Sequence, residues 1–222
     1  MKLSVLAGAL LLLPAVALAE VTAELSLVSE YLDNGVTNTD RKPALQGELS
    51  YEHESGAYLT GWASNVDYGG PEKLEVDVML GYAFALNDDW ALDVGASHFQ
   101  YLGKSGATDS SYQDVFVGTT FKENTDFYAQ FSPNYFGEDA YNIILTLEHR
   151  IDFDPYELSL KLVHNQSEDR DLVGWGDYQD FEVAVSREWV GLDFTLGGLV
   201  TTLDSPEADP RVFLSISKAW SW

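Results

Sequence analysis

The sequence predicts an all-β protein: a transmembrane antiparallel up-and-down β-barrel of about twelve strands, preceded by a cleaved signal peptide. Three observations predict it. Residues 212–222, VFLSISKAWSW, alternate apolar with small or polar side chains and end on the aromatic Trp222. Apolar residues elsewhere are dispersed, with no run of the roughly eighteen that a membrane helix needs. Connections between the alternating segments are short and long in turn, as in outer-membrane barrels.

Residues 1–19 have the pattern of a secretory signal peptide. Lys2 precedes an apolar stretch, and Ala17-Leu-Ala19 is the small-x-small pattern that a signal peptidase cleaves. A transmembrane helix is the alternative, but the apolar stretch is short and contains Pro14, and no basic stop follows. We therefore expect the mature chain to begin near Glu20 and residues 20–222 to form the barrel.

The strands are indicated by a period of two in hydrophobicity, clearest over residues 73–85. One face of that segment is apolar and consists of Leu74, Val76, Val78, Leu80, Tyr82 and Phe84. The other face is mostly polar or small and consists of Glu75, Asp77, Met79, Gly81 and Ala83. The same split recurs within residues 24–27, 45–52, 114–121, 141–150, 157–162, 180–186 and 192–197. A helical period of 3.6 is absent from these segments.

Connection lengths predict the orientation of the barrel. Short connections are expected near 54–56, 87–89, 122–126, 152–155 and 187–191, and long ones at 33–43, 68–73, 102–110, 133–139, 166–177 and 204–210. Short turns face the periplasm in such barrels, long loops face outward, and an even strand number returns both ends to the periplasmic side. Aromatic residues are expected at the periplasmic rim, namely Tyr51, Tyr82, Phe84, Trp90, Phe121, Phe127, Tyr156, Phe194, Trp220 and Trp222.

A soluble barrel or β-sandwich is the competing fold. A lipocalin-like barrel has an apolar interior and carries its charges outside. Here the second face of each strand carries carboxylates, which could not form a shared core without unpaired buried charge. The sequence therefore favours an apolar face toward lipid and an acidic face toward water.

Composition narrows the function further. The formal net charge is −24, which argues against a nucleic-acid partner because phosphate contacts depend on Lys and Arg. There is no cysteine, which suits a chain that crosses an oxidising periplasm. No Pro-rich or Ser-rich linker divides the chain, so we expect one domain after the signal.

Several turn and strand motifs resemble those of one family. They are Pro43-Ala-Leu-Gln-Gly47, Ser55-Gly-Ala-Tyr58, Trp62-Ala-Ser-Asn-Val66, Leu80-Gly-Tyr-Ala-Phe84, Ser132-Pro-Asn-Tyr-Phe-Gly137 and Ser215-Ile-Ser-Lys-Ala-Trp220. Over nearly the whole mature chain the sequence resembles the TorF-type porin family, proteobacterial outer-membrane barrels described as conserved proteins of unknown function. The resemblance implies a barrel and, more loosely, porin activity. Asn34-Gly35 stands where an Arg-Gly pair is expected in that family, which removes a base from the first external loop.

The C-terminal strand carries the expected signal for the barrel-assembly machinery in Leu214, Ile216, Trp220 and Trp222. Lys218 departs from the pattern because its parity places it on the lipid face. Its ammonium could snorkel to the periplasmic interface, which we favour, or a local bulge could turn it inward.

Parity also predicts which residues line the lumen. Acidic side chains dominate this set, which is Glu48, Glu52, Glu75, Asp77, Asp93, Asp114, Glu148, Arg150, Glu157, Lys161, Asp180, Glu182 and Asp193. Carboxylates favour cations, and about twelve strands should enclose a narrow lumen. We therefore predict a porin-like passive channel for small cationic or neutral solutes. The acids could instead pair with Arg150 and Lys161 around a plugged core. Whether Trp62, Trp175 and Tyr178 form a constriction or a sugar platform stays open.

Two other functions remain as alternatives. A barrel enzyme acting on lipids, of the phospholipase or lipid A deacylase type, needs a Ser and a His with an orienting partner, and His164, Asn165 and Ser167 are the nearest candidates. Such a cluster is more often an ordinary strand end, so we predict no catalytic site. A non-conducting structural or adhesive barrel would depend on the external loops, none of which is long enough for a folded head.

The predicted setting is the bacterial outer membrane, with lipid, lipopolysaccharide, the assembly machinery and small solutes as partners and with oligomers allowed. We expect no cofactor and no dedicated metal site, because no loop has EF-hand spacing. Loop acids could share Ca²⁺ or Mg²⁺ with lipopolysaccharide phosphates, although most should simply be solvated, and they are Asp33, Asp40, Glu138, Asp139, Glu168, Asp169, Asp171, Asp204, Glu207 and Asp209.

Overall fold

A computed structural model describes residues 19–104, 106–168, 176–205 and 209–222. The predicted signal peptide therefore lies, apart from Ala19, outside the described residues, as do the loop residues Asp169, Asp171, Trp175 and Glu207. Among the described residues no helix is long and apolar enough to cross a lipid bilayer.

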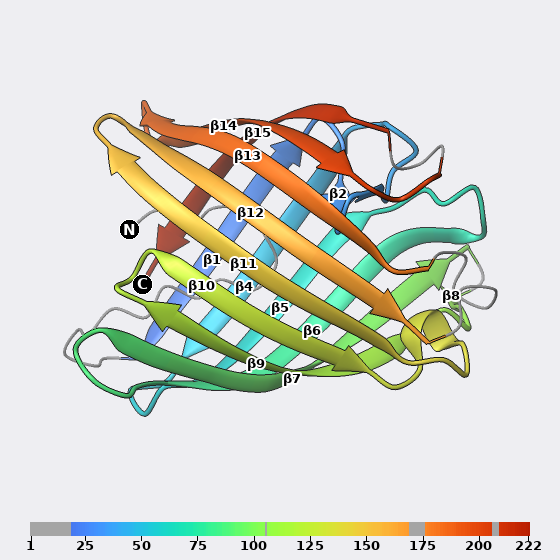
Figure 1. Ribbon diagram of the computed structural model, residues 1–222, viewed down its shortest axis with the longest axis horizontal. Coiled ribbons are helices and arrows are strands. Elements are labelled where there is room, and N and C mark those ends of the chain that lie inside the picture. The colour runs from blue at the N-terminus through green and yellow to red at the C-terminus, as the bar shows by residue number, and fades with distance from the viewer. Residues whose placement is uncertain (1–18, 105, 169–175, 206–208) are drawn as a thin grey trace.

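The chain forms a closed antiparallel barrel of twelve long strands, as predicted (Figure 1). These are β1 (Glu20–Val28), β4 (Ala44–Glu52), β5 (Ala57–Asn65), β6 (Glu72–Ala85), β7 (Trp90–Gly103), β9 (Tyr112–Phe121), β10 (Thr125–Ser132), β11 (Asn142–Phe153), β12 (Tyr156–Ser167), β13 (Tyr178–Trp189), β14 (Leu192–Thr201) and β15 (Arg211–Ser221). Each pairs with its neighbours in the chain, and β1 pairs with β15 to close the ring. The backbone polar groups of the wall are thereby paired without a free sheet edge.

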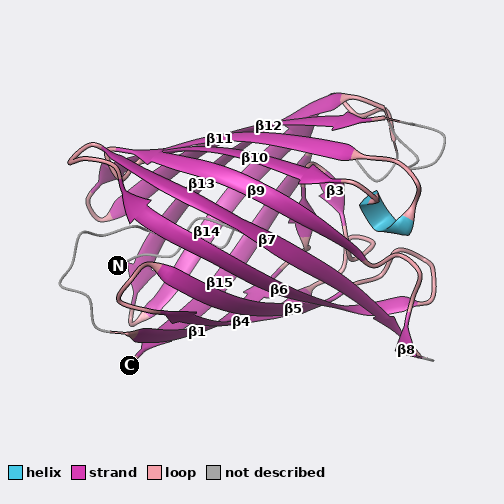
Figure 2. Cartoon of the chain, turned by 90° about the horizontal axis from the view of Figure 1, so that it is seen from below, coloured by secondary structure: helices cyan, strands magenta, loops and turns pink. Residues whose placement is uncertain are grey.

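Short turns lie at one end of the barrel and long loops at the other, with the C-terminus at the turn end (Figures 1 and 2). The first and last strands meet there, because Val21 and Trp222 exchange two backbone hydrogen bonds of 3.0 and 3.1 Å. The loop end carries the two-residue strands β2 (Leu32–Asp33), β3 (Val36–Thr37) and β8 (Gly106–Ala107) and the 3₁₀ turn η1 (Tyr135–Gly137).

Several predicted turns are too long. The segment 122–126 is polar throughout, yet β10 already begins at Thr125, so Asp126 belongs to a strand. The turn at 152–155 shortens to Asp154 and Pro155, and the turn at 187–191 shortens to Val190 and Gly191. Polar residues at strand ends face the lumen or the rim, so composition alone did not mark where pairing stops.

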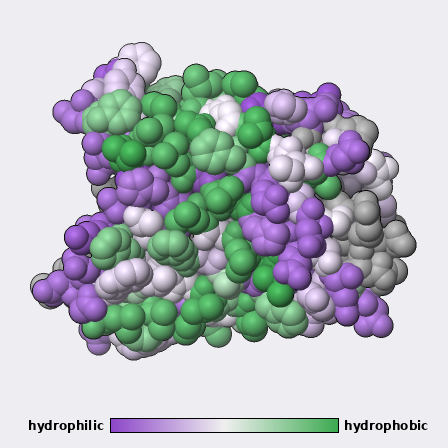
Figure 3. All heavy atoms as spheres, in the orientation of Figure 1, coloured by the Kyte–Doolittle hydropathy of each residue, from purple (hydrophilic) through white to green (hydrophobic). Residues whose placement is uncertain are grey.

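The outward face of the strands is apolar. On β6, for example, Val78 is 46% exposed and Leu80 is 62% exposed. Figure 3 shows hydrophobic residues over much of this face, with hydrophilic residues at its two ends and in patches between them. Rings pair at the turn end, including Tyr82 with Phe84 and Trp90 with Phe121, whose centroids lie 5.6 and 4.7 Å apart. A band of apolar groups with an aromatic girdle is what a lipid-facing barrel wall requires.

Lys218 keeps the parity of β15, since the pairing with β1 runs through it without a bulge. Its Nζ donates to the Gly191 carbonyl in a turn at 3.3 Å and lies 5.8 Å from the Trp220 ring centroid. The ammonium thus reaches the turn end, as the snorkelling alternative predicts. Leu214, Trp220 and Trp222 are exposed on the outer wall, and Ile216 is partly buried there.

Candidate functional site

An internal cavity of about 240 Å³ runs inside the barrel. Seven of the residues predicted from parity line it, namely Glu48, Glu75, Asp77, Asp114, Glu148, Lys161 and Glu182. Four others are buried on the inner wall outside that lining, namely Asp93, Arg150, Glu157 and Asp180. Glu52 and Asp193 are partly buried near the turn end. The residues predicted from strand parity therefore lie on the inner side of the barrel. How they are grouped around the ring could not be predicted from the sequence.

One side of the interior carries bases among its acids. Cross-strand pairing places Asp126, Glu148, Lys161 and Glu182 side by side on β10, β11, β12 and β13. Arg150 Nη1 contacts Asp126 Oδ2 and lies 3.8 Å from Glu148 Oε1. Ser159 also donates to Glu148 at 2.8 Å. Bases on this wall thus have neighbouring acids, which is the condition under which buried charge is tolerated.

The opposite side of the interior carries acids without bases. On the strands β4, β5, β7 and β9 the inward positions include no Lys or Arg, and Lys73 of β6 is exposed at the loop end, where it pairs with Asp67. Tyr58 and Tyr128 satisfy one of these acids, since the hydroxyls of both donate to Asp93 at 3.0 Å. Four other acids of this wall, Glu48, Glu75, Asp77 and Asp114, line the cavity.

Sequence reasoning missed several contributors to the interior, including Glu24 and Glu30, which line the cavity. Asp126 was assigned to a turn, and Arg211, an inward base at the loop end, lies 3.4 Å from Glu30 Oε1. Asp33 was expected to be a solvated loop acid, but it lines the cavity instead. Burial raises the pKa of Asp33 above its ordinary value, and the charge of Lys161 opposes that shift. The Asn34-Gly35 pair could have indicated that Asp33 lies in a hairpin rather than in an open loop, because this pair is typical of a tight hairpin turn.

The hairpin of β2 and β3 folds into the mouth of the barrel. Its turn residues Asn34 and Gly35 have positive φ values of 46° and 79°, which fits a two-residue type I′ turn. The Tyr178 hydroxyl donates to the Asn34 carbonyl at 2.8 Å, which fixes the hairpin tip against β13. A second cavity, of about 640 Å³ at the loop end, shares Asp33 and Asn34 with the inner cavity. The hairpin tip therefore stands between the two, and Tyr178 helps to hold this narrowing.

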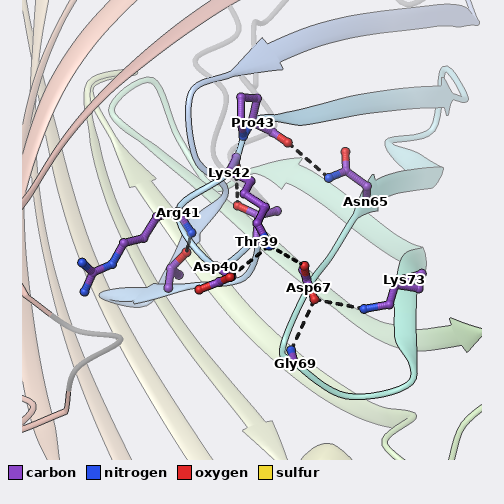
Figure 4. A network of polar contacts seen from close by, with 10 residues as sticks. Thr39, Asp40, Arg41, Lys42, Pro43, Asn65, Asp67, Gly69 and Lys73 are labelled. Carbon is purple, nitrogen blue, oxygen red and sulfur yellow. Dashed lines mark hydrogen bonds and ion pairs between the residues drawn. The ribbon is translucent and has the colours of Figure 1, made fainter.

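The base of this hairpin is tied to the next loop by the polar network of Figure 4. Lys42 Nζ lies 2.8 Å from Asp67 and 3.0 Å from Asp40, and Lys73 Nζ lies 2.9 Å from Asp67. These two ammonium groups and the Gly69 amide hold the pKa of Asp67 below its usual range. Arg41 also meets Asp209 at 3.0 Å. Asp40 and Asp209 thus pair with bases of the chain itself.

The enzyme candidates do not converge. On β12, Asn165 is fully buried on the inner side, and Ser167 shares its parity and donates to Asn142 at 2.8 Å. His164 has the opposite parity, and its Nδ1 lies 2.9 Å from Gln179 Nε2. A serine nucleophile needs its histidine within hydrogen-bond reach, which side chains on opposite faces of one strand cannot provide. Among the described residues no cluster of three or more His, Cys, Asp or Glu is placed to hold a metal.

The fold is similar to solved outer-membrane porins. The KdgM porin has a TM-score of 0.55 at 8% identity, over 90% of this chain and 99% of that one. A structure described as the KdgM porin in complex with disordered oligogalacturonate has a TM-score of 0.56, also at 8% identity, with the same coverage. The NanC porin has a TM-score of 0.50 at 9% identity, over 91% of this chain and 98% of that one. At these identities the likeness concerns the fold alone.

No curated protein matches the chain by sequence. One family model does, and it spans residues 15–216, which is nearly the whole chain and every strand except the end of β15. The chain therefore belongs to the Gcw_chp family, described as bacterial proteins of unknown function.

Proposed function

We propose that this protein is a passive channel of the bacterial outer membrane, with a negative interior that favours small cationic or neutral solutes. The observation that carries the proposal is the internal cavity, whose lining includes Glu48, Glu75, Asp77, Asp114, Glu148 and Glu182 but Lys161 as its one base among the described residues. Fixed carboxylates attract cations and repel anions over a Debye length of about 8 Å at physiological salt, comparable to the half-width expected of a narrow pore.

The charge of the interior also argues against one class of solute. A related fold, the KdgM porin, has been solved with oligogalacturonate, a polyanionic sugar. Glu75 and Asp77 on β6 and Asp114 on β9 would repel such a solute, because all three line the cavity and the one base of its described lining, Lys161, lies on β12. We therefore expect acidic oligosaccharides to be excluded even though the barrel architecture is shared.

Reversal potentials in planar bilayers test the proposal. With purified protein under a KCl gradient, we expect a potential of the sign that indicates K⁺ selectivity, and we expect the selectivity to decline as salt screens the interior charge. Liposome swelling with cationic, neutral and anionic solutes of matched size should rank them in that order. Anion preference, or a complete lack of conductance, would refute the channel.

The setting is part of the proposal. The apolar outer wall, the aromatic rim and the C-terminal Leu214, Ile216, Trp220 and Trp222 suit assembly into the outer membrane by the barrel-assembly machinery, next to lipopolysaccharide. We also propose that the chain is one of the TorF-type porins, which its turn and strand motifs resemble. In membrane fractionation the protein should sediment with the outer membrane and need detergent for release. Recovery as a freely soluble protein would contradict this setting.

We also propose transport rather than catalysis. The separation of His164 from Ser167 by strand parity supports this choice. Phospholipase and lipid A deacylase assays, with Ser167→Ala as the comparison, should show no activity that depends on the serine. A hydrolysis lost in Ser167→Ala would favour the enzyme alternative instead.

A further inference from the structure

A row of acidic and aromatic side chains crosses the inner wall along the hydrogen-bond direction. Direct cross-strand partners link Glu48 to Trp62, Trp62 to Asp77, Asp77 to Phe99, and Phe99 to Tyr112. All five side chains line the inner cavity, on β4, β5, β6, β7 and β9. We call these five residues the acid–aromatic row. Its last two rings stack with centroids 4.5 Å apart and planes 14° from parallel, so each ring packs against a face of the other.

Carboxylate oxygens at this row lack partners within the protein. Asp77 Oδ1 has no hydrogen-bond partner among the described residues. Glu75 lies two residues farther along β6, on the same inner face, and is only 3% exposed. Its Oε1 accepts from the Tyr101 hydroxyl at 2.7 Å, whereas Oε2 has no partner in the described part of the chain. Both side chains line the cavity. Buried carboxylate oxygens without partners are costly, so a cation in the cavity would stabilise them.

Among the described residues that line the cavity, no base stands beside the row to supply that cation. Lys161 and Arg150 are inward bases of the strands across the barrel, and they stand among Asp126, Glu148 and Glu182. Apart from protonation, neutralisation of the acid–aromatic row therefore requires a cation that enters the lumen.

The rings indicate what kind of cation fits. A metal ion takes a shell of oxygen ligands and gains little from aromatic carbon. An organic ammonium ion uses both parts of the row, because its N–H groups or positive charge meet the carboxylates while its carbon chain or methyl groups lie on ring faces. Trp62 stands between Glu48 and Asp77, and the ring centroids of Tyr31 and Trp62 lie 5.3 Å apart.

We infer that the acid–aromatic row, with Glu75 beside it, is a binding site for small organic ammonium ions such as diamines. The inference rests on the proposed channel, because the solute reaches the row through the lumen, and it names the solute class for which the channel is built. Binding here would slow each passing ammonium ion and would make its flux saturable.

Block of K⁺ current by 1,4-diaminobutane tests the inference in the full-length protein in planar bilayers. We expect saturable, concentration-dependent block. Asp77→Asn should raise the half-blocking concentration about tenfold, since it removes a charge-assisted contact. Trp62→Leu should raise it several-fold by removing a ring face. Two control variants make the same chemical changes at exposed positions of the turn end, Glu54→Gln and Trp189→Leu, and both should leave the block unchanged.

The outcomes separate the inference from the channel. K⁺ current without diamine block, or block by Ca²⁺ as strong as that by the diamine and indifferent to Trp62→Leu, would overturn the inference and leave the channel standing. No current at all would overturn the channel, and calorimetric titration of the detergent-solubilised protein with 1,4-diaminobutane would then decide binding alone. Gel migration before and after heating checks each variant for folding, and Glu48→Gln replaces Asp77→Asn if the latter does not fold.

Discussion

At the scale of single residues, glycines on the inner wall make room for the tyrosines that satisfy Asp93. Tyr128 pairs across the strands with Gly118, and a Cβ at Gly118 would lie 2.3 Å from the Tyr128 ring. Tyr58 covers Gly81 in the same way, with the ring 2.2 Å from such a Cβ. The two rings can therefore lie flat on the wall only because their partners have no side chain, and that position brings both hydroxyls to one carboxylate.

Gly118→Ala should therefore displace Tyr128 and break its hydrogen bond to Asp93. We expect a loss of about 1–3 kcal/mol in the free energy of unfolding, measured by urea titration in detergent micelles, because overpacking and a weakened buried hydrogen bond act together. Gly61→Ala is the matched control, since nothing lies within 4 Å of its added Cβ. Equal stability changes in the two variants would show that the ring contact does not matter.

At the scale of elements, the hairpin of β2 and β3 shows where sequence reasoning stopped. Residues 33–43 were correctly expected to connect two strands, and Asn34-Gly35 is a hairpin signal. Strands of two residues, however, are too short to display a period, and no local pattern says whether a loop folds outward or into the mouth. That choice is made by a partner distant in sequence, the Tyr178 hydroxyl on the Asn34 carbonyl.

The ties at the base of this hairpin should respond to acid. The pKa of Asp67 lies below its unfolded value, so its ion pairs with Lys42 and Lys73 contribute in full above the ordinary aspartate range near 3.9. The contribution falls as the pH drops through that range toward the lower folded pKa. We therefore expect hydrogen exchange of residues 36–42 to be slow at neutral pH and to quicken only in strong acid, after correction for the intrinsic rate.

Asp67→Asn separates this network from other acid effects. The variant should show fast exchange of residues 36–42 already at neutral pH, because an amide cannot replace both ion pairs. Glu54→Gln, in an exposed turn at the other end of the barrel, is the control for loss of one negative charge. Slow exchange in Asp67→Asn at neutral pH would mean that the hairpin base is held by other contacts.

At the scale of the whole molecule, the alternation of side chains carries most of the prediction. A period of two along strands such as β6 indicated the barrel, its strand number and the inward acids, because lipid and water impose opposite demands on the two faces. What parity could not show is how inward residues are grouped around the ring. The wall on which Lys161 stands among acids and the acid–aromatic row with Asp77 both follow from cross-strand register, which joins residues far apart in the chain.

The central claim is that alternate residues of each strand face a water-filled lumen, and cysteine modification tests it most directly because the native chain has no cysteine. Met79→Cys lies on the cavity lining, and Val78→Cys, its neighbour on β6, lies on the outer wall. In planar bilayers a cationic methanethiosulfonate reagent should lower the K⁺ current of Met79→Cys and leave that of Val78→Cys unchanged. A response at Val78→Cys with none at Met79→Cys would contradict the account.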